Sequence, residues 1–495
     1  MDKIDRVRTI RGAAYAVRNR GMGDVEGNRQ AKRETLLAEA PIPGLILKMA
    51  VPTIVAFLIN SIYSLTDTYF VHFLGTNATA AVSVNASLDQ LIMMAGSMLA
   101  VGAASYTSRL PGARDREKAG QVLSTAFFGA FAFGLAVGVL GLLFTRPLVY
   151  LLGATPTCET FAIQYADYVL LVAPLMACNF VMNQCLRAEG SALFSMFGMG
   201  FGGILNCVLD PIFIFNLDMG VAGASIATAI SKVVSFLILI FPYVSRRSLL
   251  RLSVRSVRLV KDILYQVVSV GSSSMFRSGL AVVSGIVLNN IAGDISDSVL
   301  AGVGVSTKIM MFPFGVILGF GTGFQPVAGF NWGAKRYGRV RESFRFASRT
   351  AIAVGLVMGA ALALGADGVI ALFAETDPEM EAVGALCIRL QCLAMPVHSW
   401  VAVVNMFCAG LGDARGALVL STSRQGTCFL PIVYPMAWLF GTTGVAAVQA
   451  VADGLSLALA VPIVRKVLGR VKQAEAALET QGAPQAVPRE WGKAP

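Results

Sequence analysis

Long apolar segments recur along the whole of this 495-residue chain and constrain its fold more than any other feature. Each is about 20 residues long, the length that an α-helix needs to cross a bilayer core of about 30 Å. Twelve such segments begin near residues 45, 80, 119, 165, 191, 222, 264, 299, 345, 385, 418 and 444. Charged residues make up only 14% of the chain, against about 25% in soluble domains. The sequence therefore predicts an all-α polytopic membrane protein with twelve transmembrane helices.

Basic residues are concentrated in alternate loops between these segments. The chain carries a net charge of +11, and its cations cluster at 109–118, 245–261 and 333–349. The intervening loops, with sequences HFLGTNATA, FNLDMGVAG and FGTTG, contain no Lys or Arg. Because positively charged loops stay on the cytoplasmic side, this pattern predicts that the basic loops and both termini are cytoplasmic. The distribution of the basic residues therefore indicates that the chain associates with a lipid bilayer and not with nucleic acid.

The chain is predicted to contain five parts, and its sequence indicates no obligatory protein partner. The parts are a cytoplasmic N-terminal tail at 1–44, an N-terminal six-helix bundle at 45–244, a basic cytoplasmic linker at 245–263, a C-terminal six-helix bundle at 264–468 and a cytoplasmic C-terminal tail at 469–495. The eight cysteines occur singly, without the spacing of disulfide or metal ligands. They are predicted to be small buried residues.

An internal repeat underlies the two predicted bundles. Similar motifs recur at a nearly constant displacement along the chain: AAVSVN (80–85) and AGVGVS (301–306), GARD (112–115) and GAKR (333–336), NQCLRAEG (183–190) and NMFCAGLG (405–412), GVAG (220–223) and GTTG (441–444). Each half therefore holds six helices, an even number that gives both halves the same orientation. The expected architecture is two six-helix bundles related by a pseudo-twofold axis along the membrane normal, with a central cleft that suits alternating access.

Two carboxylates occur inside the apolar segments, where a charge is costly. Placing one at the centre of a bilayer costs about 2.5–3.5 kcal/mol. Asp67 occurs in SLTDTYF, and Asp210 lies one helical turn after Asn206, on the same helix face, and directly precedes Pro211. Two neighbouring carboxylates in a low dielectric cannot both stay charged without a cation. The pair is therefore predicted to bind and release H+ or Na+.

The energy source within this chain is predicted to be an ion gradient, since no phosphate-binding GxxxxGK[ST] loop occurs. The second half does not duplicate the acids, because Leu288 and Pro431 stand at the positions of the repeat that correspond to Asp67 and Asp210. The coupling site is therefore expected in the first bundle alone. A structural role for each acid, as the partner of a buried cation or as a helix cap, is the alternative.

The chain resembles the multidrug and toxic compound extrusion (MATE) transporters across roughly residues 45–465. The motifs that carry the resemblance are SLTDTYFVHFLGTNATAAVSV, LRAEG, NCVLDPIFIFNLDMGVAGASIATAISK and GFQPVAGFNWGAKRYGRV, in this order. The resemblance implies secondary active export of cationic, amphipathic small molecules in exchange for Na+ or H+, without enzymatic activity and without a cofactor beyond that ion. Likeness to bacterial members implies the plasma membrane, which is the bacterial inner membrane.

The resemblance also assigns residues to the ion and substrate sites. The ion or proton site would comprise Asp67, Asn206, Asp210 and Thr228, with Tyr63 one turn before Asp67 in the same group. The substrate site would include Asn179 and Asn183, which share one helix face, and Met199 is expected to face the cleft. Hydrogen bonding between helices is the alternative role for the two asparagines.

Other polar residues inside the spans either have two alternative roles or are predicted to be structural. Other MATE branches carry acids in helices seven and eight, where this chain has Arg277 and Lys308, so a second-bundle Na+ site is not expected. Lys308 is either a cleft charge or the partner of a carboxylate, and Asp89 either attracts cations or reaches interfacial water. We predict that Arg277 pairs with Asp453. His398 is expected to be a hydrogen-bonded core group.

Two other functions compete with drug export. A flippase for a lipid-linked sugar or polysaccharide precursor of the same superfamily would tend to have an arginine-lined cleft and helices beyond twelve. The sequence predicts no extra helices and no arginine-rich cleft in the first bundle. A membrane-embedded enzyme would require a catalytic cluster, but the sequence contains no metal-binding His/Glu motif and no nucleophile elbow.

Overall fold

The computed structural model describes residues 35–113, 115–374 and 377–480, and it is helical throughout these ranges apart from short connections. The first half contains α2 (Ile42–His72), α3 (Thr76–Gly112), α4 (Arg116–Leu143), α5 (Thr145–Leu151), α6 (Glu159–Ala188), α7 (Ala192–Pro211), η1 (Ile212–Asn216) and α8 (Gly220–Val244). The connection to the second half includes η2 (Val254–Ser256). The second half contains α9 (Lys261–Ile295), α10 (Asp297–Gly333), α11 (Tyr337–Leu364), α12 (Ala366–Ala374), α13 (Pro378–Leu411), α14 (Ala414–Thr422), η3 (Ser423–Thr427) and α15 (Leu430–Thr480).

Eleven described helical segments are long and apolar enough to cross a membrane. The last of them, Ala414–Thr480, has 67 residues and would be about 100 Å long as one straight helix. Since this is more than three times the thickness of the bilayer core, the segment must cross twice. Its helix breaks at Gly441, where the backbone adopts φ 55° and ψ −132°. The twelve predicted crossings are therefore confirmed within the described ranges.

Polar side chains define where several helices begin. The Asp115 carboxylate accepts a hydrogen bond from the backbone N–H of Lys118 at the start of α4. Ser296 does the same for Val299 at the start of α10, and Asp377 accepts from two backbone N–H groups at the start of α13. Such caps satisfy N–H groups that have no partner within the helix. They fix the connections on both sides of the apolar belt.

The sequence repeat is also a repeat of backbone conformation. Gly190 and Gly412, which end the paired motifs NQCLRAEG and NMFCAGLG, have φ values of 83° and 79°. Gly220 and Gly441, which begin the paired motifs GVAG and GTTG, both have φ 55°. These positive φ values favour glycine because a Cβ would clash with the backbone. The two halves therefore turn at equivalent places, as one ancestral unit used twice would.

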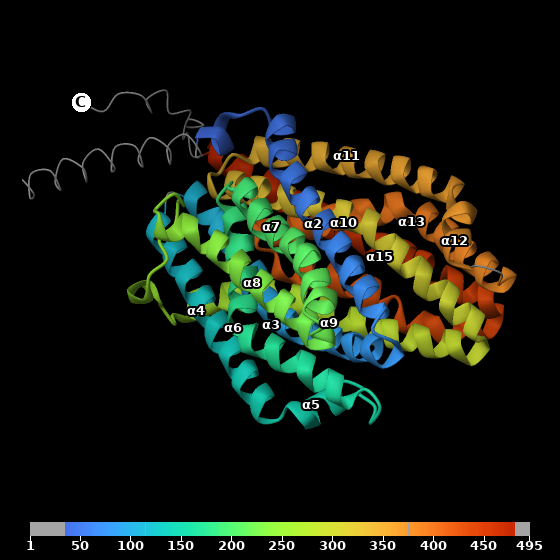
Figure 1. Cartoon of the computed structure of the whole chain (residues 1–495). Coiled ribbons are helices and arrows are strands. Elements are labelled where there is room, and N and C mark those ends of the chain that lie inside the picture. The colour runs from blue at the N-terminus through green and yellow to red at the C-terminus, as the bar shows by residue number, and fades with distance from the viewer. Residues whose placement is uncertain (1–34, 114, 375–376, 481–495) are drawn as a thin grey trace, which may run out of the picture.

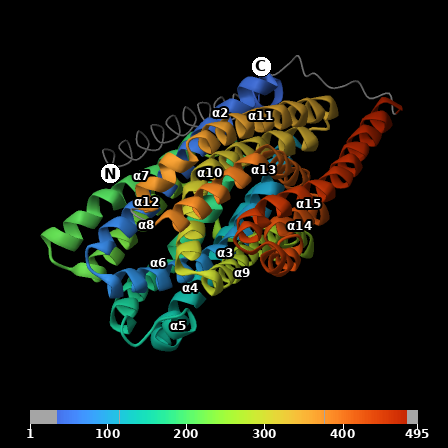
Figure 2. The same cartoon turned by 90° about the vertical axis from the view of Figure 1, so that its right-hand side faces the viewer.

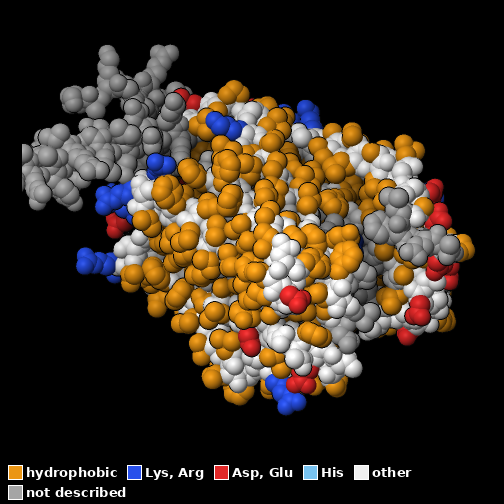
Figure 3. Space-filling model, in the orientation of Figure 1, with side chains coloured by type: hydrophobic (Ala, Val, Ile, Leu, Met, Phe, Trp, Pro, Cys, Tyr) orange, Lys and Arg blue, Asp and Glu red, His pale blue; other side chains and the backbone are white. Residues whose placement is uncertain are grey.

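The helices form two groups that lie side by side, one from each half of the chain (Figure 1 and Figure 2). Between the groups, α2 packs against α10, and α3 packs against α9. Figure 3 shows a broad belt of apolar side chains over the helices, with Lys and Arg mainly at the left end and Asp and Glu mainly at the right end. This separation of charge fits a molecule that spans a bilayer, with the basic and the acidic loops at its two ends.

A seam of glycines closes the two bundles against each other near the basic end. A Cβ atom added to Gly102 of α3 would lie 1.9 Å from the carbonyl oxygen of Val267 in α9. One added to Gly323 of α10 would lie 2.4 Å from the Cα of Ala50 in α2. Small residues allow helix backbones to approach this closely. Because these residues occupy the helix halves next to the basic loops, the bundles are in contact at that end.

The linker between the bundles is held by the first bundle. The Glu189 carboxylate at the end of α6 accepts hydrogen bonds from the Ser248 hydroxyl at 2.6 Å and from the backbone N–H of Leu249 at 2.7 Å. The backbone N–H of Arg258 donates to the Thr125 hydroxyl at 3.0 Å. The linker up to Arg258 is therefore bonded to α4 and α6.

Candidate functional site

The first bundle contains a buried polar cluster made from three helices. Asn206 and Asp210 lie one turn apart on α7, Thr228 lies on α8 and Asp67 lies on α2. The Nδ2 atom of Asn206 donates to Asp210 Oδ1 at 3.2 Å and to Thr228 Oγ1 at 3.1 Å. Asp210 is fully buried, and Asp67 is 8% exposed. The structure therefore joins Asn206, Asp210 and Thr228 by hydrogen bonds and places Asp67 within electrostatic range of Asp210.

Three oxygen atoms of this cluster are buried without a hydrogen-bond partner in the described part of the chain. They are Asp67 Oδ1, Asn206 Oδ1 and Asp210 Oδ2. Buried acceptors normally have a donor or a cation, because leaving one unpaired costs about 1–3 kcal/mol. Carboxylate and amide oxygens are the groups that hold a proton or a hard cation such as Na+. The chemistry of these oxygen atoms suits a proton as well as Na+.

Pro211 shapes the helix at this site. The α-helical part of α7 ends at Pro211, and the π-helical turn η1 follows directly. Proline has no N–H group and so removes one hydrogen bond of the helix. A π-turn inserts an extra residue and often marks a functional position. Asp210 consequently lies at the last turn of regular helix, where the backbone is irregular on one side.

Two tyrosines extend the cluster. The hydroxyl groups of Tyr63 in α2 and Tyr165 in α6 both interact with the hydroxyl of Thr228. Tyr63 was predicted to belong to this group, whereas Tyr165 was not. No sequence pattern distinguishes Tyr165 from an ordinary buried aromatic residue of α6, because its role depends on how α6 is rotated against α8.

A lysine lies beside the acids and was missed by sequence reasoning. The Nζ atom of Lys232 in α8 lies 5.3 Å from the centre of the Tyr63 ring. Lys232 interacts electrostatically with Asp67 and with Asp89 of α3. The signal was present in the sequence, since Lys232 is a charged residue inside an apolar span, one turn after Thr228. Asp89 is half-buried and lies within electrostatic range of the site, as its possible role in attracting cations requires.

The three residues assigned to substrate binding lie on α6 and α7. The Asn179 amide donates to the carbonyl oxygen of Lys232 at 3.0 Å, and the Asn183 amide donates to that of Ser195 at 3.3 Å. Both amides therefore join α6 to a neighbouring helix, and their Oδ1 atoms are buried without a partner among the described residues. Met199 is half-buried, and its sulfur lies 4.0 Å from Arg187 Nη1.

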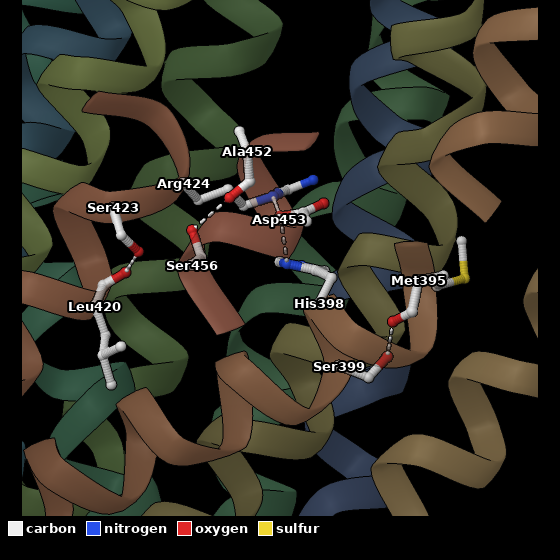
Figure 4. A network of polar contacts seen from close by, with 9 residues as sticks. All are labelled: Met395, His398, Ser399, Leu420, Ser423, Arg424, Ala452, Asp453 and Ser456. Carbon is white, nitrogen blue, oxygen red and sulfur yellow. Dashed lines mark hydrogen bonds and ion pairs between the residues drawn. The ribbon is translucent and has the colours of Figure 1, made fainter. Parts of the chain in front are cut away.

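The second bundle contains a different polar network, drawn in Figure 4. The Nε atom of Arg424 lies 2.8 Å from Asp453 Oδ1, and Nδ1 of His398 lies 3.6 Å from the same oxygen. The Arg424 guanidinium also stacks on the ring of Phe314, 4.2 Å from its centre. Asp453 and His398 are buried. This network joins α10, α13, η3 and α15, which are four separate elements of the second bundle.

The predicted pair between Arg277 and Asp453 is wrong. Asp453 bonds to Arg424, while the Arg277 guanidinium donates to the hydroxyl of Ser274, one turn away on α9, at 3.3 Å. Arg424, and not Arg277, is the partner of Asp453. Its side chain projects from the π-helical turn η3, which lies next to Asp453. Lys308 is exposed on α10 and forms no ion pair with a described residue, so a carboxylate partner within its own chain is not supported.

Comparison with known proteins agrees with this architecture. The MatE family model matches residues 52–212 and 274–439. The multidrug export protein MepA of Staphylococcus saprophyticus is 27% identical over 401 residues, covering 81% of this chain and 88% of that protein. MepA of Staphylococcus aureus (strain MSSA476) is 27% identical over 427 residues, covering 86% and 94%.

Solved structures show the same fold. An outward-facing multidrug resistance MATE family transporter of the MOP superfamily superposes with a TM-score of 0.84 at 24% identity, covering 89% of this chain and 98% of that one. A crystal structure of MATE in the straight conformation gives a TM-score of 0.82 at 25% identity, covering 89% and 99%. Since the family model matches more than half of the chain, this protein belongs to the MatE family of membrane transporters.

Proposed function

We propose that this protein is a secondary active multidrug efflux antiporter, which exports cationic amphipathic compounds in exchange for H+ or Na+ by alternating access. We place it in the plasma membrane, the bacterial inner membrane, with both termini in the cytoplasm. The observation that carries the proposal is the buried cluster of Asp67, Asn206, Asp210 and Thr228, with its three unpaired acceptor oxygens among the described residues. Membrane-embedded acids of this kind mark ion and proton pathways.

Three further observations support the proposal. The curated relatives that cover most of the chain are named multidrug export proteins. The cluster of unpaired acids lies in the first bundle, whereas the Asp453 carboxylate of the second bundle is paired with Arg424. The glycine seam, in which Gly102 and Gly323 meet the backbone of the other bundle, closes the molecule at the basic end. Closure at one end is what alternating access requires of either of its two end states.

Efflux from proteoliposomes under imposed ion gradients tests the proposal. Rhodamine 6G, a fluorescent organic cation, would be loaded into vesicles that hold the native chain, Asp67→Asn or Asp210→Asn, and a Na+ or H+ gradient would then be imposed separately. We expect the native chain to expel the dye in response to one of the two gradients, and both variants to lose this response. Gradient-driven efflux at the native rate in both variants would contradict the proposal.

A further inference from the structure

Lys232 of the first bundle is a charged residue inside a membrane span, and the proposed ion site does not by itself require a lysine there. It is a half-buried cation about halfway along α8, a helix of 25 residues that spans the membrane. A charged side chain at this depth is costly and marks a functional position. Because Lys232 lies midway between Gly220 and Val244, the two ends of the helix, its side chain would have to cross roughly half of the bilayer to reach either water phase.

The ammonium group of Lys232 lies near three groups that stabilise a cation. Its Nζ atom lies over the aromatic ring of Tyr63, at 5.3 Å from the centre. Asp67 and Asp89, from α2 and α3, both interact with it electrostatically. In the described part of the chain, the acids of this cluster are Asp67, Asp89 and Asp210, and Lys232 is the cation that acts on the first two.

The backbone of Lys232 is tied to α6, while its ammonium group lies on an aromatic ring and forms no close ion pair with a carboxylate of the described residues. Its carbonyl oxygen accepts the hydrogen bond of the Asn179 amide at 3.0 Å, which ties this turn of α8 to α6. The side chain has a four-carbon stem and carries a compact charge, so the ammonium can swing between carboxylates without any movement of the backbone. The position of the Lys232 backbone is therefore fixed by α6, and the charged end of its side chain is connected to it by a flexible stem.

The repeat supports a specific role for the position. Asp453, the single carboxylate in the network with Arg424 and His398, occupies the position of the second half that corresponds to Lys232. The two equivalent positions thus each hold a residue whose charge is opposite in sign to that of its neighbours: Lys232 lies near acids, and Asp453 lies near Arg424. In the second bundle that counter-charge forms a close pair at 2.8 Å, whereas in the first bundle the lysine stays on an aromatic face next to the acids.

We propose that Lys232 is a tethered counter-cation of the acidic cluster, which neutralises Asp67 and Asp89 in the absence of substrate and which an organic monocation must displace in order to bind. This inference rests on the proposed export of cationic substrates and adds the residue that sets affinity for them. An ammonium group on the protein and a cationic substrate compete for the same carboxylates. The site would therefore favour monocations with a large apolar surface, because burial of that surface must compensate for displacing the Lys232 ammonium from the carboxylates.

Equilibrium binding of a matched pair of dyes tests this competition. Rhodamine 6G is a monocation, and its free acid, rhodamine 19, has the same ring system with a carboxylate and no net charge. Binding to the purified full-length chain would be measured by fluorescence anisotropy for the native protein, Lys232→Met and Lys232→Arg. For rhodamine 6G, we expect the Kd to fall about tenfold in Lys232→Met, since one unit charge is removed at close range in a partly buried site. Lys232→Arg should bind like the native chain, and rhodamine 19 should respond less than rhodamine 6G.

Two controls separate electrostatic competition from structural damage. Lys48→Met removes an exposed lysine near the start of α2, away from the acidic cluster, and should leave both Kd values unchanged. In an Asp67→Asn, Asp89→Asn background, Lys232→Met should no longer tighten binding. Unchanged or weaker binding of rhodamine 6G to a folded Lys232→Met, or tightening that persists without the acids, would overturn the inference. The binding assay needs no ion gradient, so a failure of ion coupling would be seen separately, in the efflux experiment.

Discussion

Asn206 and Asp210 are joined side chain to side chain one turn apart on α7, with Nδ2 of the amide 3.2 Å from Oδ1 of the carboxylate. The same nitrogen reaches Thr228 on α8, so one amide group positions the carboxylate and braces two helices. It leaves Asp210 Oδ2 unpaired among the described residues, available to a proton or a cation. The amide is therefore central to the proposed ion site although it carries no charge.

Replacing Asn206 with leucine should reduce ion-driven efflux about five- to 150-fold, because loss of a buried hydrogen-bond partner costs about 1–3 kcal/mol. Thr228→Val should reduce it less, since Asp210 would keep its bond to Asn206. Initial rates of rhodamine 6G efflux in proteoliposomes measure both effects. Native rates in Asn206→Leu at equal reconstitution would show that the amide does not position the acid. As a control, Thr53→Val removes a hydroxyl of α2 that bonds to the backbone of its own helix, nearly four turns before Asp67, and it should behave like the native chain.

The helices and most of the polar cluster of the first bundle could be predicted from the sequence. Span length and the charge of the loops follow directly from the thickness and chemistry of a bilayer, and the repeat predicts the two bundles. Asn206 and Asp210 could be paired because four residues make about one turn of a single helix. Joining Asp67 and Thr228 to them relied on the family resemblance, since contacts between helices depend on tilt and rotation.

The remaining contacts depended on features that a sequence does not reveal. Arg277 and Asp453 both occur well inside spans of the second half, but the π-turn η3 shifts the register before α15 and places Arg424 over Asp453. The role of Lys232 was not apparent because it depends on the nearness of Tyr63 on α2 and of Asp89 on α3, which are distant from it along the chain. The unpaired atoms of Asn179 and Asn183 likewise became visible only with the neighbouring helices in place.

Introducing valine at Gly323 should prevent the bundles from closing at the basic end. A Cβ at this position would lie 2.4 Å from the Cα and 2.7 Å from the backbone nitrogen of Ala50, and backbone atoms cannot move aside as a flexible side chain can. We expect transport to be lost while the protein remains folded in its inward-open form. Spin labels placed on α2 and α10 near the basic end would report a longer distance by double electron–electron resonance.

The matched control for this seam is Gly285→Val. A Cβ on Gly285 of α9 would meet no atom within 4 Å, so the substitution should leave both the distance and the transport rate close to native. A native distance in Gly323→Val would show that the seam tolerates a side chain and is not the closing contact.

Breaking the ion pair of the second bundle should destabilise the protein without removing the ion site. Asp453→Asn would leave the charge of Arg424, whose side chain is 16% exposed, uncompensated, and loss of one partner of a buried pair costs up to about 3–5 kcal/mol. We expect a clear fall in the thermal unfolding midpoint in detergent. The double variant Arg424→Met, Asp453→Leu should recover much of that loss, since the uncompensated charge is then absent.

A double-mutant cycle distinguishes Arg424 from Arg277 as the partner of Asp453. Arg424→Gln should be non-additive with Asp453→Asn in its effect on unfolding, because the two groups are in contact. Arg277→Gln should be additive with Asp453→Asn, since the guanidinium of Arg277 bonds to Ser274 instead. Coupling of Arg277 and not Arg424 to Asp453 would contradict the assigned network.

The central claim, that Asp67 and Asp210 exchange an ion for an organic cation, is tested most directly by running the exchange in reverse. An imposed rhodamine 6G gradient would be the only driving force across the vesicle membrane, and movement of H+ would be followed with an internal pH dye and movement of Na+ with a radioactive tracer. The account predicts that dye leaving the native transporter by its exit route drives one of these ions in the opposite direction, and that Asp67→Asn and Asp210→Asn abolish the ion movement. Dye movement with no accompanying flux of either ion in the native chain, or an unchanged ion flux in both variants, would contradict it.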